Sequence, residues 1–284
     1  MMGNAKAYAV AILAALLAVI ATQAETAPGY RELRRLPAQE ARQGVATDAR
    51  FVYAIEDSKI GKYDKVSGKR VALFEGDPKV FIHMNSCSVL AAELVCAMSN
   101  FPNLPMISSV EWFSTATMQH VRTHSFGPTS GSLTWIDWHD GAWWACFANY
   151  DNRGGDPARN HTATTLVKFN AQFVAEASWL FPENVLDKFG HMSASGGRWG
   201  RGGLLYVTGH DLPEMYVLRL PAAGARLEYV STLSLPTGGQ AFDWDRSKPG
   251  HLWTVERKES VLVESALPTG SPGSAVTGTL PPQN

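Results

Sequence analysis

Five times along the chain, a short apolar burst passes through an aromatic residue or a cysteine and then breaks into a polar turn. The bursts are FVYAIEDS from Phe51, LVCAMSNF from Leu94, AWWACFANYD from Ala142, LLYVTGHD from Leu204 and HLWTVERK from His251. With Tyr53, Cys96, Trp144, Tyr206 and Trp253 taken as equivalent, the intervals are 43, 48, 62 and 47 residues. A period of about fifty residues, carried by strand-like units, is typical of a ring of similar sheets rather than of a sandwich or an α/β enzyme.

Each burst has further strand-like stretches on both sides. In the first unit QGVATDAR precedes the burst, and IGKYDKVSG and KRVALFEG follow it. The third unit joins its first two strands through Asp140-Gly141, a typical hairpin turn. The strand-like pattern of the last unit ends at Leu267, before a fourth strand. We therefore expect residues 30–36 to supply its outer strand and to protect the sheet edge. The sequence therefore predicts an all-β chain, a β-propeller of five four-stranded blades over residues 43–267, closed by the N-terminal segment 25–42.

The fourth unit departs from this pattern. The run GGRWGRGG from Gly196 stands where the other units have a strand and a tight turn. We expect a long hairpin loop here, with Trp199 exposed, and a loop that closes over an anionic or sugar ligand is the alternative.

The two ends of the sequence differ from the repeats. Lys6, the apolar stretch AYAVAILAALLAVIA from Ala7 and the small residues Thr22 and Ala24 predict a signal peptide over residues 1–24. A retained membrane anchor is the alternative, although about 15 apolar residues are short for a bilayer span. We expect an exported protein, secreted or periplasmic, that leaves the membrane once the signal is cleaved. Residues 268–284 are rich in Pro, Gly, Ser and Thr and predict a disordered tail.

The net charge of the chain indicates whether a nucleic acid is among its partners. The formal net charge is −1 at pH 7, whereas a nucleic-acid-binding protein usually carries a basic excess. We therefore expect no nucleic-acid partner.

Export makes a disulfide possible among the three cysteines. A hairpin about Ala91-Ala92 pairs Leu90 with Glu93 and places Cys87 opposite Cys96, close enough to bridge. Two buried free thiols remain the alternative. Cys146 lies in an apolar run between tryptophans and Phe147, which predicts a buried, inert thiol.

In propellers as a class, the loops that enter each blade and the loops that join the second strand to the third open on one face around the central channel. By this analogy ten loops converge, and nearly every one carries a polar side chain. Turn chemistry explains some of them, such as Asp57 with Ser58. The predicted ligand-binding residues are Gln43, His83, Asn85, Ser132, Asn149, His191, Gln240 and Glu256.

The same face offers groups for catalysis. His210 would act as a general base with Asp211 as its neighbour, and Arg257 would stabilise an anionic oxygen. Both His210 and Asp211 can face a pocket only if they lie on the turn itself, because successive strand residues point to opposite sides.

Four oxygen-bearing side chains on separate loops suit a Ca²⁺ site. They are Glu56, Asn100, Asn149 and Asp211. In architecture and ligand types the chain resembles the calcium-dependent lactonase and gluconolactonase propellers. That resemblance implies six blades, whereas this chain shows five repeats and shares no contiguous motif with them. A transition-metal set of His83, His191 and His210 and a pocket without metal are the alternatives.

The sequence thus predicts a polar binding face for a small molecule, a carbohydrate or an organic acid. A metal-assisted hydrolase or lactonase on the same face is an alternative from another class. A third is a scaffold that docks a protein partner through these loops.

Overall fold

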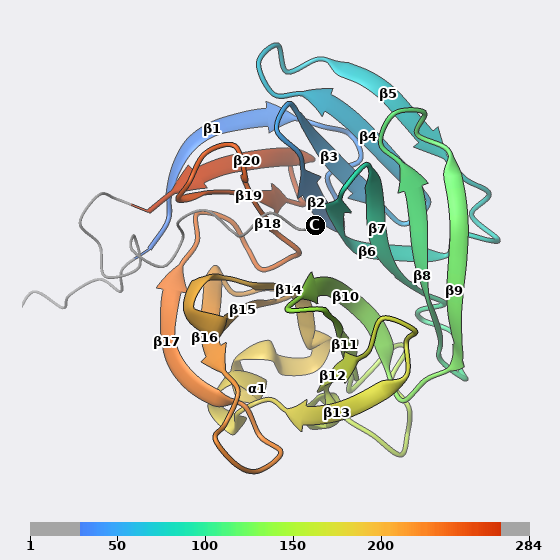
Figure 1. Ribbon diagram of the computed structural model, residues 1–284, viewed down its shortest axis with the longest axis vertical. Helices are drawn as coiled ribbons and strands as arrows, with labels where there is room; N and C mark the ends of the chain where they lie inside the picture. The colour runs from blue at the N-terminus through green and yellow to red at the C-terminus, as the bar shows by residue number, and fades with distance from the viewer. Residues whose placement is uncertain (1–28, 268–284) are drawn as a thin grey trace, which may run out of the picture.

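Five antiparallel sheets of four strands surround a central axis in the computed structural model, which describes residues 29–267 (Figure 1). Blade I contains β2 (Gly44–Thr47), β3 (Phe51–Glu56), β4 (Lys59–Asp64) and β5 (Arg70–Glu75). Blade II contains β6 (His83–Leu90), β7 (Glu93–Ser99), β8 (Ile107–Ser114) and β9 (His120–Pro128). Blade III contains β10 (Ser132–His139), β11 (Ala142–Ala148), β12 (Thr165–Phe169) and β13 (Ala175–Leu180). Blade IV contains β14 (Ala194–Trp199), β15 (Leu204–Gly209), β16 (Glu214–Arg219) and β17 (Glu228–Ser234).

Blade V joins the two ends of the described chain. Its strands are β18 (Asp243–Trp244), β19 (His251–Glu256), β20 (Val261–Ala266) and β1 (Arg31–Pro37). β1 pairs antiparallel with β20 on the outer side of the sheet, and Figure 1 shows the blue strand beside the red one. The predicted five-bladed propeller and its N-terminal closing strand are both confirmed. The predicted signal peptide (1–24) and tail (268–284) lie outside the described residues.

The core is divided among the blade interfaces. Five apolar clusters of buried residues each join two neighbouring blades, and together they cover all five interfaces. Tyr53, Cys96, Trp144, Tyr206 and Trp253 all lie on the second strand of their blade and contribute to these clusters. The repeat is therefore visible in the sequence because each blade presents apolar side chains to both of its neighbours.

The hairpin that carries the two cysteines has the predicted register. Leu90 pairs with Glu93 and Cys87 with Cys96, and the two cysteines form a disulfide with their Cα atoms 4.0 Å apart. Cys146 is fully buried, and burial raises the pKa of its thiol to about 12. Asp140 and Gly141 both have positive φ angles, as a two-residue hairpin turn requires.

The Gly-rich run of the fourth unit was predicted wrongly. Residues 194–199 form the innermost strand β14, Trp199 is buried, and the turn follows at η3 (Arg201–Gly203). A Cβ on Gly197 would overlap the Trp135 ring, so glycine is needed here for a close approach between blades III and IV.

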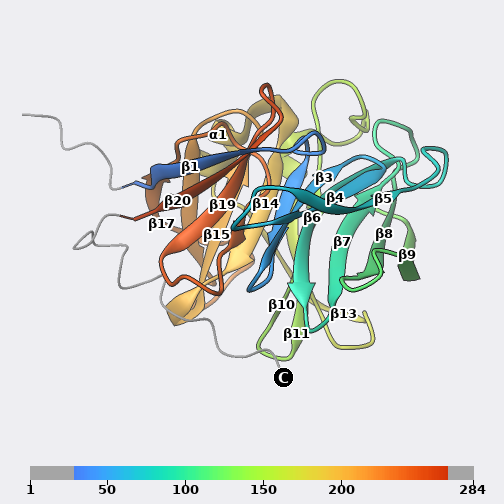
Figure 2. The ribbon, with the colours of Figure 1, turned by 90° about the horizontal axis from the view of Figure 1, so that it is seen from above.

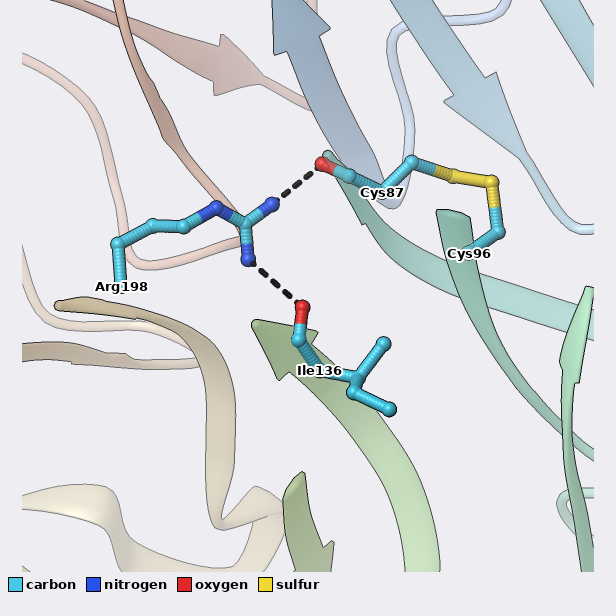
Figure 3. Close-up of a disulfide and its surroundings, with 4 residues drawn as sticks. All are labelled: Cys87, Cys96, Ile136 and Arg198. Carbon is cyan, nitrogen blue, oxygen red and sulfur yellow. Dashed lines mark hydrogen bonds between the residues drawn. A yellow bond between two sulfur atoms is a disulfide. The ribbon is translucent and has the colours of Figure 1, made fainter. Parts of the chain in front are cut away.

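Arg198 of β14 is buried, and Figure 3 shows its guanidinium between Cys87 of β6 and Ile136 of β10. Its guanidinium donates to the carbonyl oxygens of Cys87 in blade II and Ile136 in blade III. It also pairs with Asp243 of blade V at 3.3 Å, and the other oxygen of Asp243 accepts the Thr47 amide of blade I at 2.8 Å. One network therefore links all five innermost strands.

Apart from η3, the helical segments of residues 29–267 lie in loops at the face where strands two and three are joined, here called the top face. α1 (Glu183–Phe189) and η2 (Gly190–Met192) precede blade IV, and η1 (His161–Ala163) lies between β11 and β12. Figure 2 shows α1 at the upper edge of the ring in that view. Within residues 29–267 no helix is long and apolar enough to cross a membrane.

Candidate functional site

A small cup lies at the centre of the top face, with a volume of about 60 Å³. All five blades contribute to its wall. The lining residues are Gln43, His83, Asn85, Phe101, Thr134, Tyr150, Met192, Ser195, His210, Gln240 and Arg257. Six of them, Gln43, His83, Asn85, His210, Gln240 and Arg257, were among the predicted site residues.

Asp57 lies outside the lining of the cup and holds two of the lining side chains, His83 and Gln43, in place. Its Oδ1 accepts hydrogen bonds from His83 Nδ1 at 2.7 Å and from Gln43 Nε2 at 2.9 Å. Burial acts to raise the pKa of Asp57. The pKa is lowered overall by the hydrogen bonds from His83 and Gln43 and by the positive charges of His83 and Arg257. The sequence interpretation treated Asp57 as a turn residue, and it does lie in the turn between β3 and β4, but it also positions two lining side chains.

A second chain of hydrogen bonds runs along the opposite wall. Arg257 Nη1 lies 2.8 Å from His210 Nε2, and His210 Nδ1 lies 2.7 Å from Asp211 Oδ1. Because a guanidinium can only donate, Nε2 must accept, and Nδ1 carries the proton that is donated to Asp211. His210 is therefore neutral in this arrangement, and its lone pair is directed at Arg257. Both His210 and Asp211 lie in the turn between β15 and β16, as their shared orientation requires.

Asn85 brings an unpartnered donor to the cup. It lies on β6 where the pairing with β7 is irregular, and its side chain is 4% exposed. Its Nδ2 has no hydrogen-bond partner. A buried amide without a partner costs about 1–3 kcal/mol, so this donor favours an acceptor bound in the cup.

A wider groove of about 720 Å³ adjoins the cup between blades IV and V. It shares His210, Gln240 and Arg257 with the cup. Two predicted site residues, Asp211 and Glu256, line the groove rather than the cup.

The structure places the remaining predicted ligand-binding residues elsewhere. The Ser132 hydroxyl is buried against Ser99 at 2.7 Å. Asn149 lines a separate cleft and donates to the Ala163 carbonyl. His191 is exposed and bonds through Nδ1 to Asp151.

The four residues predicted to bind calcium do not share one cavity. Asn149 lines the cleft and Asp211 the groove, and the Asn100 Oδ1 accepts the Ile107 amide of its own loop at 2.8 Å. Glu56 ends β3. In the described part of the chain, no three His, Cys, Asp or Glu side chains are grouped as a metal site would need. The calcium site stays a prediction.

Five lining residues were not predicted: Phe101, Thr134, Tyr150, Met192 and Ser195. Thr134 and Ser195 lie on the innermost strands β10 and β14 at points where the pairing with the second strand is irregular, so the direction of their side chains does not follow from strand alternation. The inner strands reach further into the cup than the loop analogy indicates.

Comparison with known proteins places the chain by fold alone. No family model and no curated protein matches its sequence. A luciferin-regenerating enzyme is similar in structure, with a TM-score of 0.52, 10% identity, and coverage of 88% of this chain and 97% of that one. The hydrazine synthase of Kuenenia stuttgartiensis gives a TM-score of 0.45 at 10% identity, covering 77% of this chain and 69% of that one. The WD40 propeller domain of Doa1 gives 0.43 at 10% identity, covering 80% and 79%. The chain is a five-bladed β-propeller with a loose relationship to other propellers.

Proposed function

We propose that this protein binds the carboxylate group of a small organic acid in the cup of its top face. The observation that carries the proposal is the chemistry of the lining. It holds the Arg257 guanidinium, which supplies positive charge, and the unpartnered Asn85 amide, and none of its described residues is Asp or Glu. Such a wall offers donors and positive charge to an anion.

The same chemistry favours an acid over a carbohydrate. Sugar hydroxyls donate as well as accept, and protein carboxylates commonly take their protons. Asp57 and Asp211 do not line the cup, and the Oδ1 atom of each already accepts, from His83 and Gln43 in Asp57 and from His210 in Asp211. The cup is also small, since its volume of about 60 Å³ is well below the ~150 Å³ of a cavity that binds benzene. It fits a carboxylate rather than a whole sugar ring.

Export to an oxidising compartment, secreted or periplasmic, is part of the proposal. The Cys87–Cys96 disulfide supports it, because disulfides persist mainly outside reducing compartments.

Calorimetric titration with acetate and lactate tests this function. We expect both acids to bind and Arg257→Gln to weaken them at least about tenfold, because a hydrogen bond to a charged group contributes about 1.5–3 kcal/mol. The matched control is Arg122→Gln, an exposed arginine that pairs with Glu93 on blade II, away from the cup. Unchanged affinity in Arg257→Gln, or binding of methyl glucoside without binding of either acid, would contradict the proposal.

A further inference from the structure

The cup is too small for a complete ligand of ordinary size. Its volume of about 60 Å³ holds a carboxylate and little more. The rest of a bound acid must therefore extend into a neighbouring space. Two such spaces adjoin the cup: the groove between blades IV and V, and the cleft between blades II and III, which shares Tyr150 with the cup.

The cleft has an apolar character. Its volume is about 320 Å³, and Leu104, Pro105, Met106, Ala148 and Pro157 lie in its wall, together with the polar residues Thr129, Ser130, Asn149 and Asp156. A benzene ring needs about 150 Å³ of apolar space, so the cleft has room for an aryl group or a short alkyl chain.

Several residues of this wall form a hydrophobic cluster of their own. Met106, Ala148 and Tyr150 are buried, with Phe101 packed against them, and they belong to none of the five blade interfaces. Leu104 at the rim is 47% exposed. Apolar side chains placed at a loop face outside the interblade core favour an apolar ligand group.

An aromatic row connects cup and cleft. The rings of His83 and Phe101 are 5.0 Å apart, and those of Phe101 and Tyr150 are 4.8 Å apart. His83 faces the cup, whereas Tyr150 lines both spaces. The polar cup and the apolar cleft therefore share one aromatic wall.

The groove is less suited to an apolar arm. It is lined by Arg42, Lys258, Asp211, Glu256 and Glu259 among others. Two of its acids already have partners, since Asp211 pairs with His210 and Glu259 with Arg35. Desolvating these charges would oppose the binding of an apolar group.

We infer that the ligand is an amphipathic carboxylic acid, whose carboxylate binds in the cup and whose aryl or short alkyl arm binds in the cleft beside Leu104. The inference rests on the proposed function and specifies the ligand class of the same site.

The test compares acids that share a head group. Dissociation constants of acetate, phenylacetate and 3-phenylpropionate are measured by NMR titration on the wild-type protein, on Leu104→Glu and on Leu33→Glu. Leu33 is the matched control, because it is an exposed leucine of β1 on the outer side of the ring. We expect the phenyl group to tighten binding at least about tenfold over acetate, from the burial of its apolar surface. Leu104→Glu should remove that gain and leave acetate unchanged, and Leu33→Glu should leave both unchanged.

The outcomes separate the two proposals. If acetate binds but the phenyl group adds nothing, or if Leu104→Glu keeps the gain, the cleft is not the second subsite and only the carboxylate cup remains. If gluconate binds more tightly than phenylacetate and depends on Glu256, the arm lies in the groove, which also overturns the inference. If none of the acids binds, the proposed function falls and the inference with it.

Discussion

Pairs of aspartate and histidine recur on the top face. Asp57 bonds to His83, Asp151 to His161 and His191, and Asp211 to His210. Each acid lies in the loop between the second and third strands of its blade. Asp57 and Asp151 reach a histidine at the start of the next blade, so the pairs fix neighbouring top-face loops relative to one another.

The pKa of Asp151 is strongly lowered. Burial acts to raise its pKa, but the backbone amide and ring of His161 and the ring of His191 lower it from 3.8 to about 2. Because the pKa is depressed in the folded state, the stabilisation is complete above pH 3.8 and is lost as the pH falls toward 2.

The unfolding free energy of Asp151→Asn should therefore depend less on pH in acid than that of the wild type. Between pH 5 and pH 2 we expect the wild type to lose about 1 kcal/mol more unfolding free energy than the variant, since partial solvent contact reduces the full effect of the shift. Urea unfolding at both pH values measures the difference. Asp187→Asn on the exposed side of α1 is the control, and an identical acid loss in wild type and Asp151→Asn would show that this aspartate does not act as described.

At the scale of elements, the closing strand β1 carries a prediction of its own. Leu36 is 3% exposed and packs with Trp253, Val255 and Leu262 in the cluster between blades V and I. Leu36→Ala should lower the unfolding free energy by about 2–5 kcal/mol through the cavity it leaves. Leu33, three residues earlier on the same strand, is 54% exposed, and Leu33→Ala should cost no more than about 0.5 kcal/mol. Denaturant unfolding compares the two, and equal losses would show that β1 does not close the ring through buried packing.

The sequence predicted most elements because most blades repeat the same pattern. The second strands, the Ala91-Ala92 hairpin and the closing strand all follow from apolar periodicity and turn residues. β14 was missed because glycine disfavours strands locally, and the close approach to Trp135 that requires Gly197 exists only in the assembled ring. α1 was missed as well, because a helix of seven residues between two blades is too short to show a recognisable apolar periodicity.

At the scale of the whole molecule, the ring brings distant residues to one axis. Arg198 links the innermost strands of the five blades below the cup. Above it, residues from Gln43 to Arg257 meet in one wall. The top-face location of these side chains follows from blade topology, which is why much of the cup could be predicted.

The orientation of individual side chains could not be predicted in the same way. Ser132 turns to Ser99 while Thr134 faces the cup, and Asp57 acts through His83 and Gln43 rather than directly. These choices depend on contacts between blades whose residues lie far apart in the sequence.

The central claim is that the cup binds a carboxylate through its inward donors, and the Asn85 side-chain amide reports on it directly. We would titrate ¹⁵N-labelled protein with phenylacetate and follow the Asn85 Nδ2 resonances, identified by their loss in Asn85→Ser. We predict a saturable shift whose dissociation constant equals the one measured by calorimetry, because Nδ2 gains an acceptor. Saturable binding by calorimetry with unmoved Asn85 resonances would place the ligand outside the cup and contradict the account.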